Sequence, residues 1–353
     1  MSEYYRAALE KGKALRERED FYILAVETSC DETAVAVLRG KEIKSSVIMS
    51  QIDIHKRFGG VVPEIASRNH TAAIDNIVEC ALNEAGVSLT QIEAIAVTYG
   101  AGLLGALIVG VSYAKSLAYA LNIPIYGINH IKGHIFANFA FQDMQPPVIA
   151  LIASGGHTAL AKVQSYKDIE ILGSTRDDAA GEAFDKVARV LGLSYPGGPK
   201  ISALAKTGQN SIKMPRPFKG EGHLDFSFSG LKTFIVNLAH NYEQRGEAIP
   251  AADIAHSFQG EVCSILTENT IKAVRLTGIK KVVLAGGVGA NDLLREKLSS
   301  ACLALGAELS MPEKKHCTDN AAMIGVACYY AIKDNLSPSD LTLDAKAELK
   351  VWE

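Results

Sequence analysis

Residues 22–38 read YILAVETSCDETAVAVL, which is two apolar runs separated by a short polar turn. Apolar runs of this length, bounded by small polar residues, are typical of β-strands. We therefore expect strands at 22–27 and 33–38, joined by Thr28-Ser29-Cys30-Asp31-Glu32. A further apolar run at 43–49 predicts a third strand.

The same pattern begins again after Pro146-Pro147, where residues 148–163 read VIALIASGGHTALAKV. Strands are expected at 148–153 and 158–163 around the turn Ser154-Gly155-Gly156-His157, and a third strand at 169–172. The two halves of the chain thus repeat one order of strands, which indicates an internal duplication.

Strands alternate with helical patterns through the rest of the chain, which predicts a layered α/β protein in two similar halves. Asp177 or Asp178 is expected to cap the helix that follows them, and residues 195–199 are expected to form a loop. Two such halves suggest a cleft in which glycine turns bring backbone amides close to phosphate. The further strands are expected at 95–98, 125–128 and 282–285, and the helices at 62–85, 105–121, 179–191, 230–245, 252–275, 292–303 and 320–333.

Size and composition are those of a globular enzyme with about two domains. The chain has 353 residues, of which 48% are hydrophobic and 21% charged, and its net charge is −3. This charge excludes a generally basic nucleic-acid coat but permits a local basic patch. The six cysteines are widely spaced and form no CxxC pair, which favours reduced thiols over a disulfide framework or a zinc ribbon.

Residues 1–20 carry charges of both signs and no apolar core segment, which excludes a secretory signal and allows a short solvated helix. A mitochondrial presequence would lack the acidic residues, so a cytoplasmic location is expected. The apolar run at 148–153 is too short to cross a membrane, and no membrane association is expected.

A metal site is suggested by Asn129-His130-Ile131-Lys132-Gly133-His134, because histidines four residues apart lie on one face of a helix. On spacing alone, a solvated helix face explains the pair equally well. The third ligand would be Asp319, which could instead cap the apolar helix after it. Two histidines and one carboxylate make a site of the kind that iron(II) and zinc accept, with positions left open for substrate.

Two glycine-rich turns could contact a phosphate or an adenosine. The turn at 154–157 lies between two strands, where a simple hairpin also calls for glycine. Residues 286–291, Gly-Gly-Val-Gly-Ala-Asn, lie between a strand and a helix. Neither stretch is a GxGxxG motif, and no Walker A loop is present, so both common nucleotide folds are disfavoured.

Two charged stretches have a functional interpretation and a simpler one. Asp185 could accept a hydrogen bond from a hydroxyl-rich ligand or form a surface pair with Arg189. The basic, proline-broken segment at 211–222 could meet an RNA backbone, together with Lys56 and Arg57, or be a solvated loop.

Taken together, these motifs resemble the TsaD family, also called YgjD or Gcp, the bacterial and organellar branch of the universal tRNA threonylcarbamoyladenosine proteins. The resemblance runs in order from about residue 22 to 335. It is carried by residues 27–33 (ETSCDET), 58–64 (FGGVVPE), 129–134 (NHIKGH), 154–158 (SGGHT), 177–186 (DDAAGEAFDK), 195–199 (YPGGP), 226–233 (FSFSGLKT) and 317–323 (CTDNAAM).

The resemblance implies an actin-like ATPase (ASKHA) fold of two duplicated α/β domains around a central cleft. It divides the chain into an extension at 1–20, an N-terminal domain at 21–145, a C-terminal domain at 146–335 and a tail at 336–353. The implied activity is transfer of the threonylcarbamoyl group from threonylcarbamoyl-AMP to N6 of the adenosine 3′ of the anticodon, in tRNAs reading codons that begin with A.

The resemblance also implies site residues. His130, His134 and Asp319 match the ligands of one divalent metal, iron(II) or zinc. No separate catalytic residue is assigned, and Ser202 is a weaker candidate for the substrate site. The substrate-binding residues, which would hold the adenylate, are Ile152, Ala153, Ser154, Gly155, Gly156, Asp185, Gly198 and Asn291.

The implied partners are tRNA, the TsaB paralogue, the TsaE ATPase, and a YrdC-like TsaC synthase that supplies the adenylate. Pairing with TsaB is expected through the helix at 62–85. The chain departs from the family pattern at four places: the extension at 1–20, Ala101 for a common proline, Gly289 for serine and His316 for tyrosine.

Three other functions compete with this one. A metallopeptidase would need a glutamate directly after His130, where the chain has Ile131. A pseudoenzyme scaffold like TsaB would not be expected to keep both histidines and Asp319. A small-molecule carbamoyltransferase of the same superfamily would act on acceptors other than tRNA.

Overall fold

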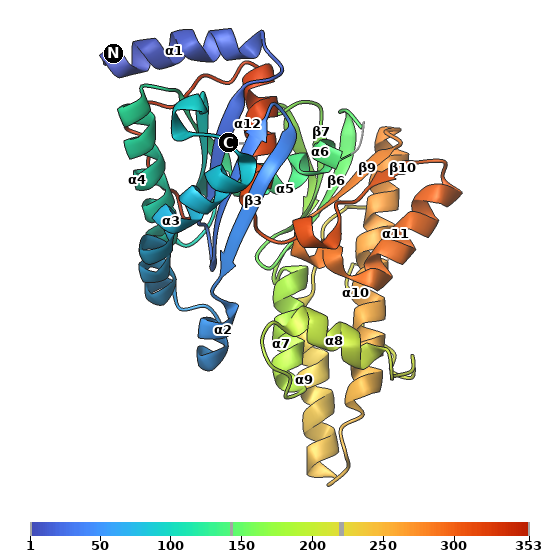
Figure 1. Cartoon of the computed structure of the whole chain (residues 1–353). Coiled ribbons are helices and arrows are strands. Elements are labelled where there is room, and N and C mark those ends of the chain that lie inside the picture. The colour runs from blue at the N-terminus through green and yellow to red at the C-terminus, as the bar shows by residue number, and fades with distance from the viewer. Residues whose placement is uncertain (1, 142–143, 219–221, 352–353) are drawn as a thin grey trace. The chain divides into compact units, whose positions relative to one another are not determined.

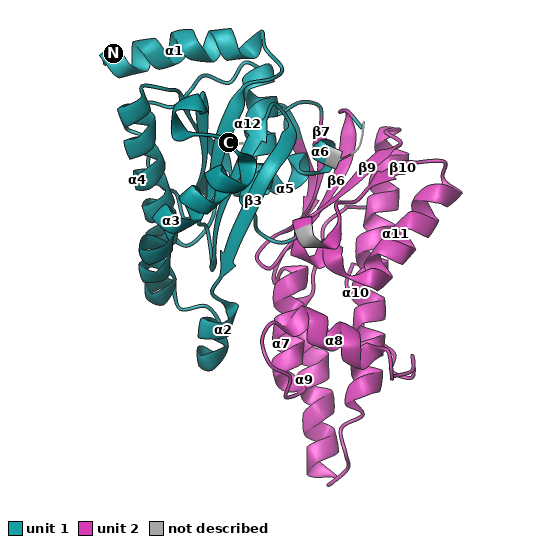
Figure 2. Ribbon diagram, viewed as in Figure 1, with its two compact units in different colours: residues 1–144, 164–169, 318–353 teal, residues 145–163, 170–317 magenta. Residues whose placement is uncertain are grey.

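A computed structural model describes residues 2–141, 144–218 and 222–351. The chain divides into two compact units, which Figure 2 colours separately: unit 1 comprises residues 1–144, 164–169 and 318–353, and unit 2 comprises residues 145–163 and 170–317. This division differs from the sequence-based one at residues 164–169 and 318–335, which belong to the first unit rather than the second, and at residue 145, which belongs to the second.

Each unit is built on a five-stranded sheet, and the two sheets have the same topology. In unit 1 the order is β3(Glu42–Ser50), β2(Glu32–Arg39), β1(Tyr22–Glu27), β4(Ala94–Gly100), β5(Ile125–Asn129). In unit 2 it is β8(Ile169–Ser174), β7(Thr158–Val163), β6(Val148–Ala153), β9(Lys281–Ala285), β10(Glu308–Ser310). The strands β1 and β6 each pair antiparallel with the next strand of the chain and parallel with a later one. The predicted duplication is therefore confirmed.

Unit 1 buries its sheet beneath three long helices: α3(Pro63–Ala85), α4(Leu104–Leu121) and α12(Ala321–Lys333). Helix α12 is apolar on nearly all sides, and it packs against β1 and β2. This packing explains why residues 318–335 belong to unit 1, because a helix apolar on all sides must be covered on several faces. The shorter helices of the unit are α2(Ile52–His55), η1(Lys56–Phe58), η2(Leu89–Gln91), α5(His130–Phe136) and α6(Asn138–Phe141).

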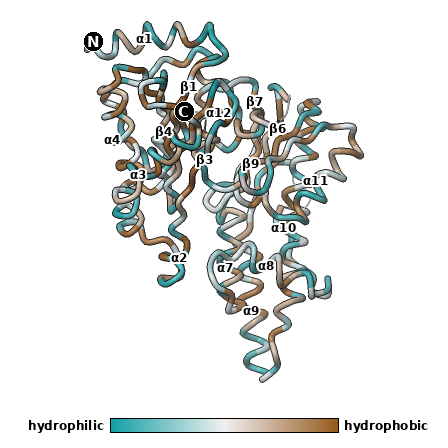
Figure 3. The backbone as a smooth tube through the Cα atoms, in the orientation of Figure 1, coloured by the Kyte–Doolittle hydropathy of each residue, from teal (hydrophilic) through white to brown (hydrophobic). Residues whose placement is uncertain are grey.

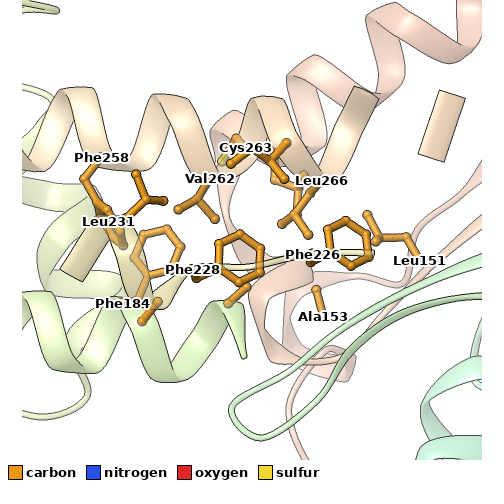
Figure 4. Packing of buried hydrophobic residues seen from close by; sticks show 14 of the residues in the cluster. Leu151, Ala153, Phe184, Phe226, Phe228, Leu231, Phe258, Val262, Cys263 and Leu266 are labelled. Carbon is orange, nitrogen blue, oxygen red and sulfur yellow. The ribbon is translucent and has the colours of Figure 1, made fainter. Parts of the chain in front are cut away.

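Unit 2 has its own hydrophobic core, part of which Figure 4 shows. The rings of Phe184 and Phe258 meet edge to face at 5.1 Å, and Phe226 stacks on Phe228 at 6.2 Å. Residues 195–199 are not wholly a loop, since a helix begins at Gly197. The helices of the unit are α7(Ala180–Val190), α8(Gly197–Ala205), α9(Ser229–Gln244), α10(Ala251–Thr277), η3(Gly287–Ala290), α11(Asp292–Ala304) and η4(Lys314–His316).

The N-terminal extension forms helix α1(Glu3–Arg16), which lies along unit 1 (Figure 1). It is not fully solvated, because Tyr4, Ala8 and Leu15 are buried. The Tyr4 hydroxyl donates to the Ile123 carbonyl at 2.8 Å, and the Lys11 ammonium donates to the Asn122 carbonyl at 2.6 Å. The extension is thus a packed part of unit 1.

Among the described residues, α4 is the one helix whose length and hydropathy would suffice to cross a bilayer (Figure 3). It packs against β4 and α3, with Ala106, Leu107 and Val111 buried. One face of α4 is therefore used within the fold of unit 1, whereas Leu104, Ile108 and Tyr119 are exposed.

Candidate functional site

The two histidines of the sequence motif lie on the short helix α5, directly after β5. The Asn129 side chain caps this helix by accepting from the backbone N–H groups of Ile131 and Lys132, at 2.9 and 3.3 Å. His130 is 8% exposed and His134 is 2% exposed. Because both rings are buried, the interpretation of the pair as a solvated helix face is wrong.

Asp319 lies beside both imidazoles. Its Oδ1 is 3.1 Å from Nε2 of His134 and 3.5 Å from Nε2 of His130. The cap of α12 is Asn320, whose side chain accepts from the Met323 N–H at 3.0 Å, so Asp319 is not the cap. One donor atom from each of the three residues falls within 4.8 Å of the other two. Two imidazole nitrogens and a carboxylate oxygen, converging in this way, fit a divalent metal ion.

A buried glutamate stands behind the first histidine. Glu27, at the end of β1, is fully buried, and its Oε2 lies 3.2 Å from Nδ1 of His130. The same carboxylate accepts from the Thr98 hydroxyl and the Ser29 N–H, both at 2.5 Å. A carboxylate at Nδ1 keeps the proton on that nitrogen and leaves Nε2 free to bind metal. Glu27, together with the Ser29 hydroxyl 3.1 Å from the same nitrogen, therefore orients His130.

The charges at this site are strongly coupled. Burial lowers the pKa of His130, but the nearby charges of Asp319 and Glu27 outweigh it and raise that pKa to about 9. Burial raises the pKa of Glu27, yet the His130 charge and hydrogen bond bring it below its usual value. Burial, with the charges of Asp31 and Asp319, raises the pKa of Glu32 to about 9. Glu32 is therefore held protonated near neutral pH, whereas the contact with His130 keeps Glu27 ionised.

The predicted substrate turn of unit 2 joins β6 to β7. It is closed by the Ser154 N–H donating to the His157 carbonyl at 2.8 Å. Gly155 and Gly156 are exposed, and no described atom lies within 4 Å of where a Cβ would stand on either. The N terminus of α7 docks on the turn, because the Gly181 N–H donates to the Ser154 carbonyl at 3.2 Å. Ile152 and Ala153 are buried in β6.

The other predicted substrate residues of unit 2 are held by local hydrogen bonds. Oδ1 of Asp185 accepts from the Gly197 N–H at 2.7 Å, so this carboxylate fixes the start of α8 beside Gly198. The Asn291 amide donates to the Ser202 hydroxyl at 3.1 Å and to Oε1 of Gln259 at 2.9 Å. Ser202 and Asn291 therefore meet in space, although 89 positions separate them.

The expected capping of α7 is wrong. Its N-cap is Ala179, and the Asp178 carboxylate instead pairs with Lys186 at 2.7 Å. The Asp177 carboxylate accepts from the N–H groups of Phe228 and Ser229, at 2.8 and 3.2 Å, and so holds the start of α9. Both carboxylates therefore have hydrogen-bond or ion-pair partners that spacing along the sequence does not predict.

The sequence of the chain is similar to one family of known enzymes. The family model described as TsaD, tRNA N6-adenosine threonylcarbamoyltransferase, matches residues 42–326. A protein of that name from Clostridium perfringens is 52% identical over 335 residues, covering 94% of this chain and 98% of that protein. Another from Clostridium beijerinckii is 51% identical over 334 residues, with the same coverage. The chain belongs to the TsaD family. It is therefore a transferase that modifies tRNA.

Solved structures support the fold of this TsaD chain. Full-length HypF superposes with a TM-score of 0.59 at 16% identity, and HypF of T. kodakarensis with 0.61 at 15%. The matches cover 91% and 89% of the TsaD chain but about half of HypF, 48% in each case. With the duplicated sheets, they confirm the predicted actin-like ATPase class.

Glu27 is the site residue that sequence analysis of this TsaD chain missed. It was treated only as the end of a strand and as part of the ETSCDET motif. The available signal was an acid at the end of an apolar run, since a buried charge needs a partner.

Gly289, one of the four departures from the family pattern, lies close to Leu284, whose side chain would be 3.2 Å from an added Cβ.

Proposed function

We propose that this TsaD chain transfers the threonylcarbamoyl group from threonylcarbamoyl-AMP to N6 of the adenosine 3′ of the anticodon, in tRNAs reading codons that begin with A. The observation that carries the proposal is the convergence of His130, His134 and Asp319 in a member of this family. The ion they would hold is iron(II) or zinc, both of which accept two imidazoles and a carboxylate.

The donor is a mixed anhydride, so its carbonyl is activated without a covalent enzyme intermediate. A divalent ion bound by the three ligands supplies a Lewis acid for the donor. The open N–H groups of Gly155 and Gly156 suit hydrogen bonding to phosphate oxygens or to charge that develops on the carbonyl. The N6 amine of the adenine attacks the carbonyl carbon, AMP leaves with the electron pair of the anhydride C–O bond, and the amine gives up one proton. Because this amine is a weak nucleophile, holding it against the face of the carbonyl must supply much of the acceleration.

The remaining predicted substrate residues take positioning roles in the proposal. Asp185 and Gly198 lie at the start of α8, where a carboxylate and a backbone amide suit a ribose hydroxyl. Asn291, fixed by Ser202 and Gln259, suits an adenine or ribose edge. Ile152, Ala153 and Ser154 shape the strand end that carries the turn.

Partner proteins complete the proposed function: a TsaC synthase that makes the adenylate, a TsaB paralogue and the TsaE ATPase, all in the cytoplasm. The helix α3 with the start of α4 is the proposed TsaB surface. Leu104 and Ile108 lie four residues apart on α4 and are 48% and 46% exposed, an apolar face suited to a partner helix.

The tRNA backbone is proposed to meet the basic segment at 211–222 and the pair Lys56 and Arg57. Within the described part of that segment, Arg216 is bound to Glu261 and Glu268 at 2.7 and 2.9 Å. Residues 219–221 lie outside the described ranges. Such contacts would show as tRNA affinity that falls steeply with salt.

The test is reconstitution with tRNA and supplied threonylcarbamoyl-AMP, followed by mass spectrometry of the nucleosides. His130→Ala and Asp319→Ala should each lose bound metal and lower modification by more than about 100-fold, because each removes a ligand. Glu308→Ala, which removes an exposed carboxylate on β10, is the matched control and should modify tRNA normally.

Retained modification by either ligand variant would refute the metal role. Two outcomes would overturn the proposed reaction itself. One is glycoprotein cleavage by the pure protein that is lost in His134→Ala. The other is carbamoyl transfer to small acceptors with no change in tRNA.

A further inference from the structure

The last described residues of the chain follow a defined path on unit 1. Residues 339–351, here called the C-terminal strap, have no regular secondary structure but are anchored at both ends. The first anchor is at the start of β5, where the Ser339 N–H donates to the Ile125 carbonyl at 2.7 Å. Leu343 then covers Gly127, at which an added Cβ would stand 2.8 Å from its side chain.

The strap next crosses the carboxyl end of β4. The Lys346 N–H donates to the Tyr99 carbonyl at 2.7 Å, and the Gly102 N–H donates to the Ala347 carbonyl at 3.0 Å. Leu349 is 5% exposed and lies against Gly100, 3.0 Å from where a Cβ would be. The strap therefore reaches the sheet edge from which the metal helix starts, since β4 and β5 are parallel.

The last anchor is a single hydrogen bond to the cap of the metal helix. The Asn129 side-chain amide donates to the Lys350 carbonyl at 2.9 Å, while its oxygen accepts the N–H groups of Ile131 and Lys132. Asn129 is 2% exposed, and the next residue is the ligand His130. One planar amide thus links the strap to the first turn of α5.

We propose that the C-terminal strap positions the metal helix through Asn129. The amide cannot turn over without placing its NH₂ group against two backbone N–H donors and its oxygen against a carbonyl. The strap carbonyl therefore fixes the plane of the cap, and the cap fixes the direction in which α5 presents His130. The inference rests on the proposed metal role of His130, His134 and Asp319.

A simple capping role and the strap role make opposite predictions for Asn129→Asp. Aspartate caps a helix as well as asparagine does, but it cannot donate to the Lys350 carbonyl. The added negative charge would by itself tighten cation binding. If the strap acts as proposed, cobalt(II) or zinc binding to the full chain weakens about two- to tenfold, the range expected for one lost hydrogen bond. Unchanged or tighter binding would overturn the proposal.

A second variant loosens the strap without touching the cap. Leu349→Ala removes buried contacts at Gly100 and should weaken metal binding in the same direction, by about two- to fivefold. The matched control is Val87→Ala, which also truncates a side chain buried in unit 1, at a residue that follows α3 and belongs to neither the strap nor α5. It should lower the melting temperature and leave metal affinity unchanged.

Two further readouts separate positioning from general destabilisation. Hydrogen exchange of the metal-free protein should speed up at Ile131 and Lys132 in Leu349→Ala but not in Val87→Ala. In the double variant Asn129→Asp/Leu349→Ala the two effects should not add, because they break one linkage. Full additivity of the two effects in the double variant would refute the linkage. Equal exchange at Ile131 and Lys132 in Leu349→Ala and Val87→Ala would refute it as well. If the wild-type chain binds no metal at all, both the metal role and this inference fail, whereas wild-type binding with unaffected variants defeats the strap alone.

Discussion

Two turns occupy the same place in the duplicated sheets and are built in opposite ways. The turn between β1 and β2 is buried: Thr28, Ser29 and Asp31 are 0, 2 and 5% exposed. The turn between β6 and β7 carries Gly155 and Gly156, both exposed and with no described atom near the place of a Cβ. One turn is filled with polar side chains, and the other exposes its backbone.

This difference shows how one strand pattern can support two tasks. In unit 1 the turn and the end of β1 place Glu27 and Ser29 against His130, a candidate metal ligand, which requires side chains of fixed direction. In unit 2 the turn leaves amide N–H groups exposed, which is what an anionic ligand requires. The two units share one sheet topology, and the residues at each turn determine what that turn can contact.

The largest effect is expected from Glu27→Gln, which removes the charge behind His130 but keeps the side-chain volume. Loss of such a carboxylate typically lowers metal affinity about 10- to 100-fold, because the imidazole loses both its orientation and part of its basicity. Competition titration with a zinc chelator measures the change. Glu93→Gln, which removes a carboxylate paired with Arg18 elsewhere in unit 1, is the control. Equal affinities in the two variants would mean that Glu27 does not support the site.

A pair of glycine variants tests the turn of unit 2. A Cβ at Gly181 would stand 2.6 Å from the Ser154 carbonyl oxygen, so Gly181→Ala should displace the turn or α7 and cost about 1–3 kcal/mol of stability.

Gly155→Ala meets no described atom and should leave the melting temperature unchanged. It should still weaken binding of a threonylcarbamoyl-AMP analogue several-fold, since the methyl group hinders close approach of the ligand. Calorimetry of both variants measures stability and affinity. Normal analogue affinity in Gly155→Ala would argue against this turn as the phosphate site.

The smallest effect concerns the acid of the first turn. The pKa of Glu32 is about 9 in the folded chain, against a usual value of 4.5. Because the unfolded chain ionises first, this residue destabilises the metal-free protein progressively as pH rises from about 4.5 to about 9. Glu32→Gln should therefore raise the melting temperature by about 1–4 °C at pH 8 and less at pH 5. A gain that is equal at both pH values would contradict the raised pKa.

The strand order and the pairing of His130 with His134 could be predicted from local signals in the sequence, whereas Asp319, 185 positions from His134, depended on the family resemblance. Alternating apolar runs mark strands, and the His130–His134 spacing marks one helix face. The bonds of Asp177 to the start of α9, and of Asn129 to Lys350, could not be predicted, since each joins residues dozens to hundreds of positions apart. The sequence does not predict strand β10, because a strand of three residues leaves too short a pattern. It does not predict α8 either, because this helix begins with glycines and a proline.

The placement of α12 in unit 1 has a consequence for biosynthesis. Asp319 lies beside His134 although 185 positions separate them, and all of unit 2 lies between them in the sequence. At ordinary translation speeds of about 5–20 residues per second, the histidines leave the ribosome roughly 10–40 s before the carboxylate that completes their site. During that interval the nascent chain offers an incomplete ligand set beside a sheet that still lacks α12. On the proposed metal role of His130, His134 and Asp319, metal loading must follow the synthesis of residue 319, and ribosome-bound chains that stop before residue 319 should retain far less metal than released ones.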